Sequence, residues 1–308
     1  MQESKVFSKD VALAKLRSDR EIYYRYPELN HILYLSGGGW TSMEGLELFT
    51  NLKVLYIEDN CLTEVPWVSH CKHLRALYVL AMSNRLHCRF ASKNRFHGVA
   101  SVLSCVELRS LDLSDNYVSY LQGIGNLVEL ETLKVSGNHL CDDTLGSLLV
   151  LNKLRNLDLS CNRITSIDSL NGFDRLRLLK VAGNPICVTP QYRKRLIFKL
   201  PDLQSLDDSP VTENERRLAC TYMTGGALAE EFEREVINEE ERCKREADFE
   251  AYQVMRQEVR RSGIAPNILH NELRERQAVF YSCGRDSLWP DEDTRSSNSS
   301  SWHSVDEG

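Results

Sequence analysis

One pattern of apolar residues recurs along the first two hundred positions and constrains the fold more than any other feature. The pattern is L-x-x-L-x-L-x-x-N-x-L, in which x is any residue. Five segments fit it closely, and they begin at Leu52, Leu108, Leu130, Leu154 and Leu176. Two weaker copies begin at Leu33 and Leu74, and Gly38 replaces the asparagine in the first of them.

The spacing between the copies gives the period. The first leucines stand at positions 52, 74, 108, 130, 154 and 176, so the successive steps are 22, 34, 22, 24 and 22. A period of about 22 residues is typical of leucine-rich repeats. We therefore predict an α/β solenoid, in which about seven coils over residues 29–200 form a leucine-rich-repeat arc with a parallel concave sheet.

Each part of the pattern has a physical role in such a coil. The L-x-L segment predicts a short strand, and successive coils stack these strands about 4.8 Å apart. Between strands, apolar residues recur every three positions, which predicts a convex side of 3₁₀ or short helical turns. The asparagine falls where the chain leaves the strand, and its amide can satisfy backbone groups unpaired there. We assign this structural role to Asn60, Asn116, Asn138, Asn162 and Asn184.

The step from Leu74 to Leu108 exceeds the period by 12, since 34 − 22 = 12. The interval from Asn94 to Leu108 equals the interval from Asn60 to Leu74. The extra residues therefore fall near 80–91, just after a strand. Three interpretations stay open: a binding loop, a tolerated surface insertion, and an error in the gene model.

Segments on both sides of the repeats are expected to cap the solenoid, because its terminal coils would otherwise expose apolar faces. Residues 1–28 predict an N-terminal helical cap, with Ser8 before a short amphipathic helix. Residues 201–226 predict a C-terminal repeat cap, since the sequence there breaks the period.

A long charged helix is predicted over residues 227–262, because residues 227–261 contain no proline or glycine. Its apolar residues form only a broken stripe: Leu228, Phe232, Val236, Cys243, Ala247 and Val254. We prefer a solvated helix partly docked on the C-terminal cap to a regular coiled coil. Residues 263–308 lose all periodicity and include a serine-rich run, which predicts a disordered tail.

Composition and absent motifs exclude several classes of function. The net charge of −6 argues against a nucleic-acid partner, and no apolar run predicts a membrane span or a signal peptide. We expect a soluble, intracellular monomer. The ten scattered cysteines predict reduced, mostly buried thiols. Cys61, His70, Cys71 and His73 lack zinc-site spacing, and catalytic motifs are absent, so we expect no metal, no cofactor and no enzyme.

The expected binding surface is the concave face, where the outward-facing strand residues gather. The middle positions of the L-x-L motifs are Tyr34, Tyr56, Tyr78, Asp112, Lys134, Asp158 and Lys180. The tyrosines are the preferred partner-binding anchors, whereas the alternating charges are also suited to neutralising one another. A second row, one residue after each first leucine, reads Lys53, Arg75, Arg109, Glu131, Arg155 and Arg177. Its positive bias indicates either an acidic partner or a solvated surface.

Several stretches together resemble the axonemal dynein assembly factor 1 family. They are residues 26–35 (YPELNHILYL), residues 46–55 (LELFTNLKVL), and above all the exit segment LDDSPV at 206–211, followed by ERR at 215–217 and Gly225-Gly226. The similarity covers roughly residues 20–260. It implies a non-enzymatic factor that helps to preassemble dynein arms in the cytoplasm before they enter cilia or flagella. Its implied partners are dynein arm subunits, chaperones and other assembly factors.

The chain departs from the family pattern in the insertion and in the turn Gly37-Gly38-Gly39, so contacts near Tyr56 and Tyr78 are the least safely carried over. No binding residue is transferred individually. Two other functions stay open: a structural axonemal component bound to dynein or microtubules, resembling the leucine-rich dynein light chain, and a protein phosphatase regulatory subunit. The helix after the cap weighs against both, because their relatives are nearly all repeat.

Overall fold

The computed structural model describes residues 5–79 and 102–262. The chain divides into two compact units, residues 1–237 and 238–308. The first unit contains the repeats and their caps, and the described part of the second is helical. The insertion predicted near 80–91 and the tail predicted at 263–308 lie outside the described residues.

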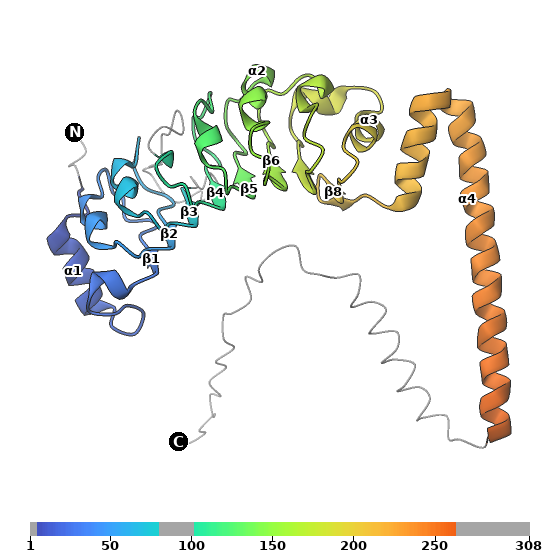
Figure 1. The fold of residues 1–308 in the computed structure, drawn as a ribbon, viewed down its shortest axis with the longest axis horizontal. Helices are drawn as coiled ribbons and strands as arrows, with labels where there is room; N and C mark the ends of the chain where they lie inside the picture. The colour runs from blue at the N-terminus through green and yellow to red at the C-terminus, as the bar shows by residue number, and fades with distance from the viewer. Residues whose placement is uncertain (1–4, 80–101, 263–308) are drawn as a thin grey trace, which may run out of the picture. The chain divides into compact units, whose positions relative to one another are not determined.

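The repeats form a sheet of short strands that follow one another in chain order (Figure 1). Within the described residues, strands β1 to β8 are parallel, and β9 is antiparallel to β8. Their bounds are β1 Ile32–Tyr34, β2 Val54–Tyr56, β3 Ala76–Tyr78, β4 Ser110–Asp112, β5 Thr132–Lys134, β6 Asn156–Asp158, β7 Leu178–Lys180, β8 Ser205–Leu206 and β9 Ser209–Pro210. This architecture confirms the predicted leucine-rich-repeat solenoid.

The long step in the repeat does not disturb the sheet. β3 and β4 pair directly, with Leu77 opposite Leu111 and Tyr78 opposite Asp112. The pairing register is therefore continuous across the long step. Strands β8 and β9 extend the sheet beyond the predicted repeat boundary at residue 200.

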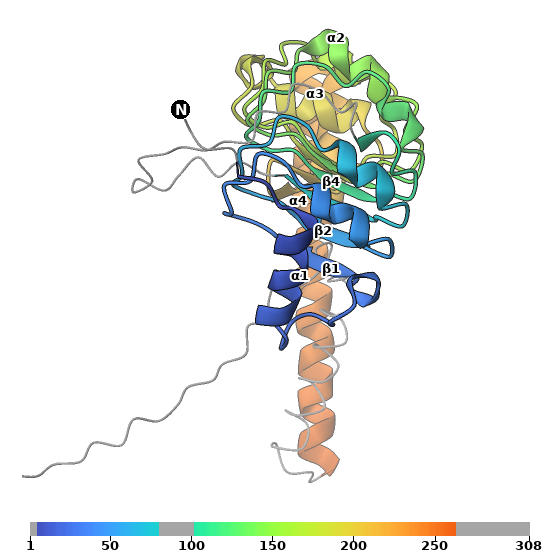
Figure 2. The same ribbon diagram turned by 90° about the vertical axis from the view of Figure 1, so that its left-hand side faces the viewer.

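Short helices occupy the convex side of the first unit, opposite the strands (Figures 1 and 2). Most are 3₁₀ segments, as the three-residue spacing predicted: η1 Pro27–Leu29, η2 Glu44–Leu48, η3 Pro66–His70, η5 Ile124–Asn126, η6 Gly146–Leu148, η7 Ile167–Leu170 and η8 Pro185–Val188. The coil between Leu130 and Leu154, which is slightly longer than the basic period, contains a short α-helix, α2 Asp142–Leu145. This helix takes up the additional length.

A ladder of buried asparagine side chains runs along the solenoid. The Asn138 amide donates to the carbonyl oxygens of Leu113 at 2.9 Å and Val135 at 3.0 Å, and its oxygen accepts from the Val118 N–H at 2.8 Å. Asn162 repeats this arrangement one coil later and shares the Val135 carbonyl with Asn138. Each asparagine therefore joins its own coil to the preceding one.

The residue before each asparagine adopts a left-handed conformation, which turns the chain off the strand. These residues are Gly37, Asp59, Asp115, Gly137, Cys161 and Gly183, with φ between 53° and 74°. At Gly137 the stacking is tight as well, since a Cβ there would lie 2.2 Å from Oδ1 of Asp115. Gly37 precedes Gly38, which stands in place of the asparagine, and it has the left-handed conformation found at the equivalent position of the other described coils.

Replacing Asn138 by leucine should lower the free energy of unfolding by about 2 to 4 kcal/mol, because the Val118 N–H and the shared carbonyls lose their partner in the core. Urea unfolding followed by circular dichroism measures the loss. Asn152→Leu is the matched control, since Asn152 is exposed and should change stability by less than about 0.5 kcal/mol. Equal losses in both variants would contradict the role of the ladder.

The N-terminal cap closes the first coil. Helix α1, Lys9–Ser18, begins after Ser8, whose side chain accepts from the Val11 N–H, and buries Ala12 and Leu16. The segment that follows is held by the buried Asn30, which accepts from the Tyr24 N–H at 2.9 Å and donates to the Tyr24 carbonyl at 3.0 Å.

The exit segment closes the other end of the sheet with a hairpin. Asp207 and Asp208 both have positive φ, 49° and 62°, as a two-residue type I′ turn between β8 and β9 requires. The Asp207 carboxylate accepts from the N–H groups of Val181 and Ala182 at 2.8 and 2.9 Å and from the Tyr192 hydroxyl at 3.0 Å. It therefore satisfies backbone donors at the end of β7.

Two helical segments follow this hairpin. Helix α4 spans Glu213–Ser262, but Gly226, with a φ of 75°, breaks it into two helices at a kink. The segment after the break agrees with the predicted helix at 227–262, whereas the segment from Glu213 to the break was not predicted. The missed signal is the capping box from Thr212 to Glu215, in which the Thr212 hydroxyl accepts from the Glu215 N–H at 3.2 Å.

Charged side chains dock α4 against helix α3, Tyr192–Lys199, and the cap. Glu230 is 6% exposed and binds Lys194 of α3 at 2.6 Å and Arg234 of its own helix at the same distance. Arg217 and Glu233, 2.7 Å apart, join the two segments of α4. Leu228 and Phe232 of the broken apolar stripe are 82% and 68% exposed. The buried apolar positions of α4 are instead Ala219 and Ile237.

Replacing Glu230 by glutamine should make local unfolding of residues 227–237 more frequent. The neutral glutamine cannot form the ion pairs with Lys194 and Arg234. The hydrogen bond from Lys194, assisted by Arg234 and opposed by burial, lowers the pKa of Glu230 below its usual 4.5. A lowered pKa stabilises the docked state at neutral pH, and this contribution is lost as the pH falls through 4.5 and below. Amide hydrogen exchange over 227–237 should accelerate by about tenfold or more at pH 7 in the variant.

Glu231→Gln is the control for this effect, since Glu231 is exposed on the same turn of α4. Its exchange should match that of the unmodified protein at both neutral and acidic pH. Unchanged exchange in Glu230→Gln would show that apolar contacts alone hold the segment.

Candidate interaction surface

Three tyrosine rings stack along the first part of the concave face. The ring centroids of Tyr34 and Tyr56 lie 4.8 Å apart with planes 13° from parallel, and those of Tyr56 and Tyr78 lie 4.5 Å apart at 4°. The in-register pairing of β1, β2 and β3 sets this spacing. Tyr34 is 49% exposed, whereas Tyr56 and Tyr78 are half-buried.

The stack changes the acidity of its central member. Burial raises the pKa of Tyr56 from 10.0 to about 12, and the neighbouring phenols Tyr78 and Tyr34 act in the same direction. The Tyr56 hydroxyl therefore keeps its proton to a higher pH than an ordinary tyrosine does.

A column of apolar residues runs beside the tyrosines. Ile32, Val54 and Ala76 occupy equivalent positions in β1, β2 and β3, on the same face of the sheet as the rings. Ile32 is 43% exposed, and the other two are partly exposed. Sequence reasoning missed this column because it considered only the position after each central leucine. The position before it carries the same signal, since strand side chains alternate between faces.

The charged half of the concave face is largely engaged within the chain. Asp112 is 7% exposed, accepts from the Ser114 hydroxyl at 2.7 Å, and lies 3.6 Å from the Lys134 ammonium. Asp158 accepts from the Ser160 N–H at 2.9 Å. Asp112 and Lys134 thus partly neutralise each other, whereas Asp158 is held by a backbone hydrogen bond.

The remaining charge on that row is paired at the end of the sheet. Lys180 lies 2.6 Å from Asp208 in the exit hairpin. The positions before the central leucines of β4, β5 and β6 are polar: Ser110, Thr132 and Asn156. The Asn156 amide donates to the Thr132 hydroxyl at 3.1 Å. The face thus consists of an apolar part on β1–β3 and a polar part whose groups mainly satisfy one another.

The second row of predicted binding residues lies beside the sheet. Its members are mainly basic, and we call it the basic rim: Lys53, Arg75, Arg109, Glu131, Arg155 and Arg177. The N–H groups of Lys53, Arg75 and Arg109 each donate to the carbonyl of the equivalent residue one coil earlier, at 2.8 Å, so these residues are direct neighbours. Arg75 lies 4.0 Å from Glu107 and Arg109 lies 3.7 Å from Glu131. Arg155 and Arg177 continue the row beyond Glu131, and all members retain exposed or partly exposed side chains.

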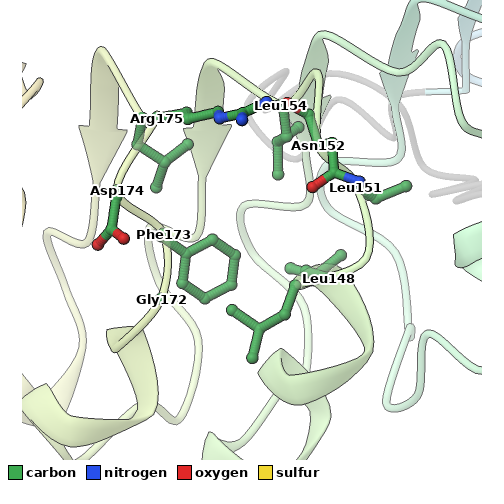
Figure 3. A pocket seen from close by; sticks show the side chains of 10 residues that line it. Leu148, Leu151, Asn152, Leu154, Gly172, Phe173, Asp174 and Arg175 are labelled. Carbon is green, nitrogen blue, oxygen red and sulfur yellow. Dashed lines mark hydrogen bonds between the residues drawn. The ribbon is translucent and has the colours of Figure 1, made fainter.

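The described part of the chain has a small pocket on its convex side and no cluster of metal ligands. A pocket of about 220 Å³ lies between two convex turns, where Arg175 donates to the Asn152 carbonyl at 3.2 Å and Phe173 faces Leu148 (Figure 3). This volume is below the range of typical ligand pockets. Within residues 5–79 and 102–262, no three potential metal-ligating side chains lie together.

The cysteines and histidines singled out from the sequence lie in separate environments. Cys71 is buried, and burial raises the pKa of its thiol to about 12. His73 contacts Glu107 at 3.2 Å, whereas His70 contacts the Trp67 carbonyl. The expectation of mostly buried thiols is wrong, because four of the eight described cysteines are exposed: Cys141, Cys161, Cys220 and Cys243. They occupy turns and helix surfaces and not the inward strand positions.

Comparisons with known proteins agree with the geometry. A sequence profile of the leucine-rich repeat family matches residues 100–237. The matched segment contains strands β4 to β9 of the solenoid. Leucine-rich repeat-containing protein ODA7 of Chlamydomonas reinhardtii is 38% identical over 65 residues, which are 21% of this chain and 15% of that protein. Immunoglobulin domain and leucine-rich repeat-containing protein 2 of Caenorhabditis elegans is 33% identical over 120 residues, which are 39% of this chain and 14% of that protein.

The chain thus spans only about a seventh of the length of these two relatives. Among solved structures, internalin C2 from Listeria monocytogenes resembles the chain with a TM-score of 0.44 and 19% identity, covering 58% of this chain and 81% of that one. Leucine-rich-repeat domains typically bind proteins and are not catalytic. No helix in the described residues has the length and apolarity needed to span a membrane.

Titration of Tyr56 tests the stack in solution. Its phenol should lose its proton near pH 12, well above the ordinary 10.0. The unfolded chain loses this proton first, so the free energy of unfolding should fall as the pH rises from 10 to 12. Nuclear magnetic resonance of tyrosine labelled with ¹³C at Cζ follows each phenol, and the signal absent in Tyr56→Phe identifies residue 56. A midpoint near 10 would contradict the stacked arrangement.

Proposed function

We propose that the protein is a non-enzymatic binding scaffold for the cytoplasmic preassembly of axonemal dynein arms, and that it engages its partners through the tyrosine stack. The observation that carries the protein-binding part is the exposed aromatic and apolar surface on β1–β3. Exposed aromatic residues on a rigid surface are typical anchors of protein interfaces. The charged half of the same face is mainly engaged within the chain, which leaves the tyrosines as the strongest candidates.

The dynein-assembly part is supported by the resemblance of the exit segment at residues 206–211 and its surroundings to the axonemal dynein assembly factor 1 family. The match with ODA7 adds support. On this proposal the protein resides in the cytoplasm and at the cilium or flagellum, and its partners are dynein arm subunits, chaperones and other assembly factors.

Deletion of the gene in a flagellated cell tests the proposal. We expect axonemes that lack dynein arms in electron-microscopic cross-sections, and a tagged wild-type copy that restores them and fractionates mainly with the cytoplasm. Intact arms in the deletion strain would contradict the assembly role. Tagged protein found only in salt-resistant axonemes would favour a structural component instead.

Complementation with Tyr34→Ala, Tyr56→Ala and Tyr78→Ala combined tests the surface. The domain should remain folded, because these side chains are partly exposed on the concave face, but the arms should not be restored. Tyr120→Ala is the matched control, since Tyr120 is 50% exposed elsewhere on the domain and should support normal rescue. Rescue by the triple variant, with a normal melting curve, would move the binding site away from the stack.

A further inference from the structure

The outer surface of the N-terminal cap is unusually apolar. A solenoid cap ordinarily presents a polar outer face, because its role is to shield the core from water. Here Ile22, Tyr24, Tyr26 and Leu29 are exposed by 65%, 66%, 59% and 50%. Large exposed apolar side chains that gather in one segment indicate an interaction surface.

This surface is rigidly attached to the sheet. Besides its bonds to Tyr24, Asn30 donates to the Tyr26 carbonyl at 2.9 Å. The Tyr34 N–H of β1 donates to the hydroxyl of Tyr23, whose side chain is 6% exposed. Tyr23 therefore covers the edge of β1, which disfavours the addition of a partner strand there. A partner must dock through side chains on a surface that is already ordered, so little ordering entropy is lost.

The tyrosine stack ends at Tyr34, on the side of the sheet nearest the N-terminal cap. One face of the Tyr34 ring lies against Tyr56, and no second ring stacks on Tyr34 among the described residues. Because β1 is the first strand of the sheet, the other ring face points toward the cap. Aromatic and aliphatic side chains from a partner can continue the stack at that position.

The charge beside this surface is positive. Lys53, Arg75 and Arg109 occupy neighbouring coils, and successive backbones are hydrogen-bonded at 2.8 Å. The carboxylates nearest to Arg75 and Arg109 are 4.0 and 3.7 Å away, too far for a strong hydrogen bond. No carboxylate in the described part of the chain forms an ion pair with Lys53. Carboxylates of a partner would therefore be attracted to this rim.

We propose that cap residues 22–29, together with Ile32 and the open end of the tyrosine stack, form one docking surface for an acidic segment of a partner protein that carries aliphatic or aromatic anchors. The anchors pack on the cap and on the free face of Tyr34, and the acidic side chains reach the basic rim. The inference rests on the proposed protein-binding function and specifies the chemistry of the partner and its position at the N-terminal end of the sheet.

Selection of a random peptide library on the full chain tests this surface directly. We expect the recovered peptides to combine Asp and Glu with aliphatic or aromatic residues. Fluorescence anisotropy then gives their Kd for the protein and its variants. Tyr24→Ser, Tyr26→Ser and Leu29→Ser combined should weaken binding by about tenfold or more, because the anchors lose their contact area.

Two further variants separate charge from apolar contact. Lys53→Glu with Arg75→Glu should weaken the same peptides about tenfold and reduce the salt dependence of binding. Tyr120→Ser, which removes an equally exposed tyrosine outside the surface, should change Kd less than about twofold. Melting curves confirm that each variant is folded, and the altered cap side chains are exposed enough for this to be expected.

Several outcomes would overturn the inference. One is the recovery of basic peptides only, or of no enriched peptides. Another is self-association in sedimentation experiments that the cap variant abolishes, which would assign the surface to a second copy of the chain. Peptides that lose binding in Tyr56→Ala but not in the cap variant would restrict the site to the sheet and leave the protein-binding proposal intact. Failure of the dynein-assembly role alone would leave the peptide results unchanged.

Discussion

The asparagine ladder is the interaction on which the rest of this structure depends. Each coil must turn off its strand while the neighbouring backbone groups are buried, and water cannot satisfy them. A primary amide meets this need because it donates and accepts at the same time. Since the amides of Asn138 and Asn162 share the Val135 carbonyl, the same bonds that close a coil also fix its register on the next one. The stacked tyrosines and the basic rim follow from that register.

Much of the solenoid is predictable from the sequence, because the pattern of leucines encodes both the strand period and the inward direction of each side chain. The spacing that identified Asn60 and Leu74 also gave the correct pairing of the strands on either side of the long step. The middle positions of the motif correctly identified the tyrosines as neighbours, because parallel strands in register place equivalent residues side by side.

The ends of the domain were harder to predict. They are held by tertiary contacts that no repeated sequence pattern encodes. The broken apolar stripe predicted a solvated, partly docked helix without identifying its contacts, and these are made by Glu230 with Lys194 of α3 and by Glu233 with Arg217 of the preceding helical segment. Nothing in the local sequence distinguishes a docking glutamate from a solvated one. The apolar cap surface was missed for a related reason: the tyrosines around Asn30 could equally have been buried, and only the fold decides which ones are.

The coil with α2 shows how this architecture accommodates a change in length. Its additional residues form helical turns on the convex side, while Leu133 and Leu157 on the strands around them remain opposite each other. In this coil the added length thus leaves the ladder of paired strands unchanged. A lineage can alter the length of such a chain without changing how its concave residues are arranged, so partner recognition and loop variation are free to evolve separately.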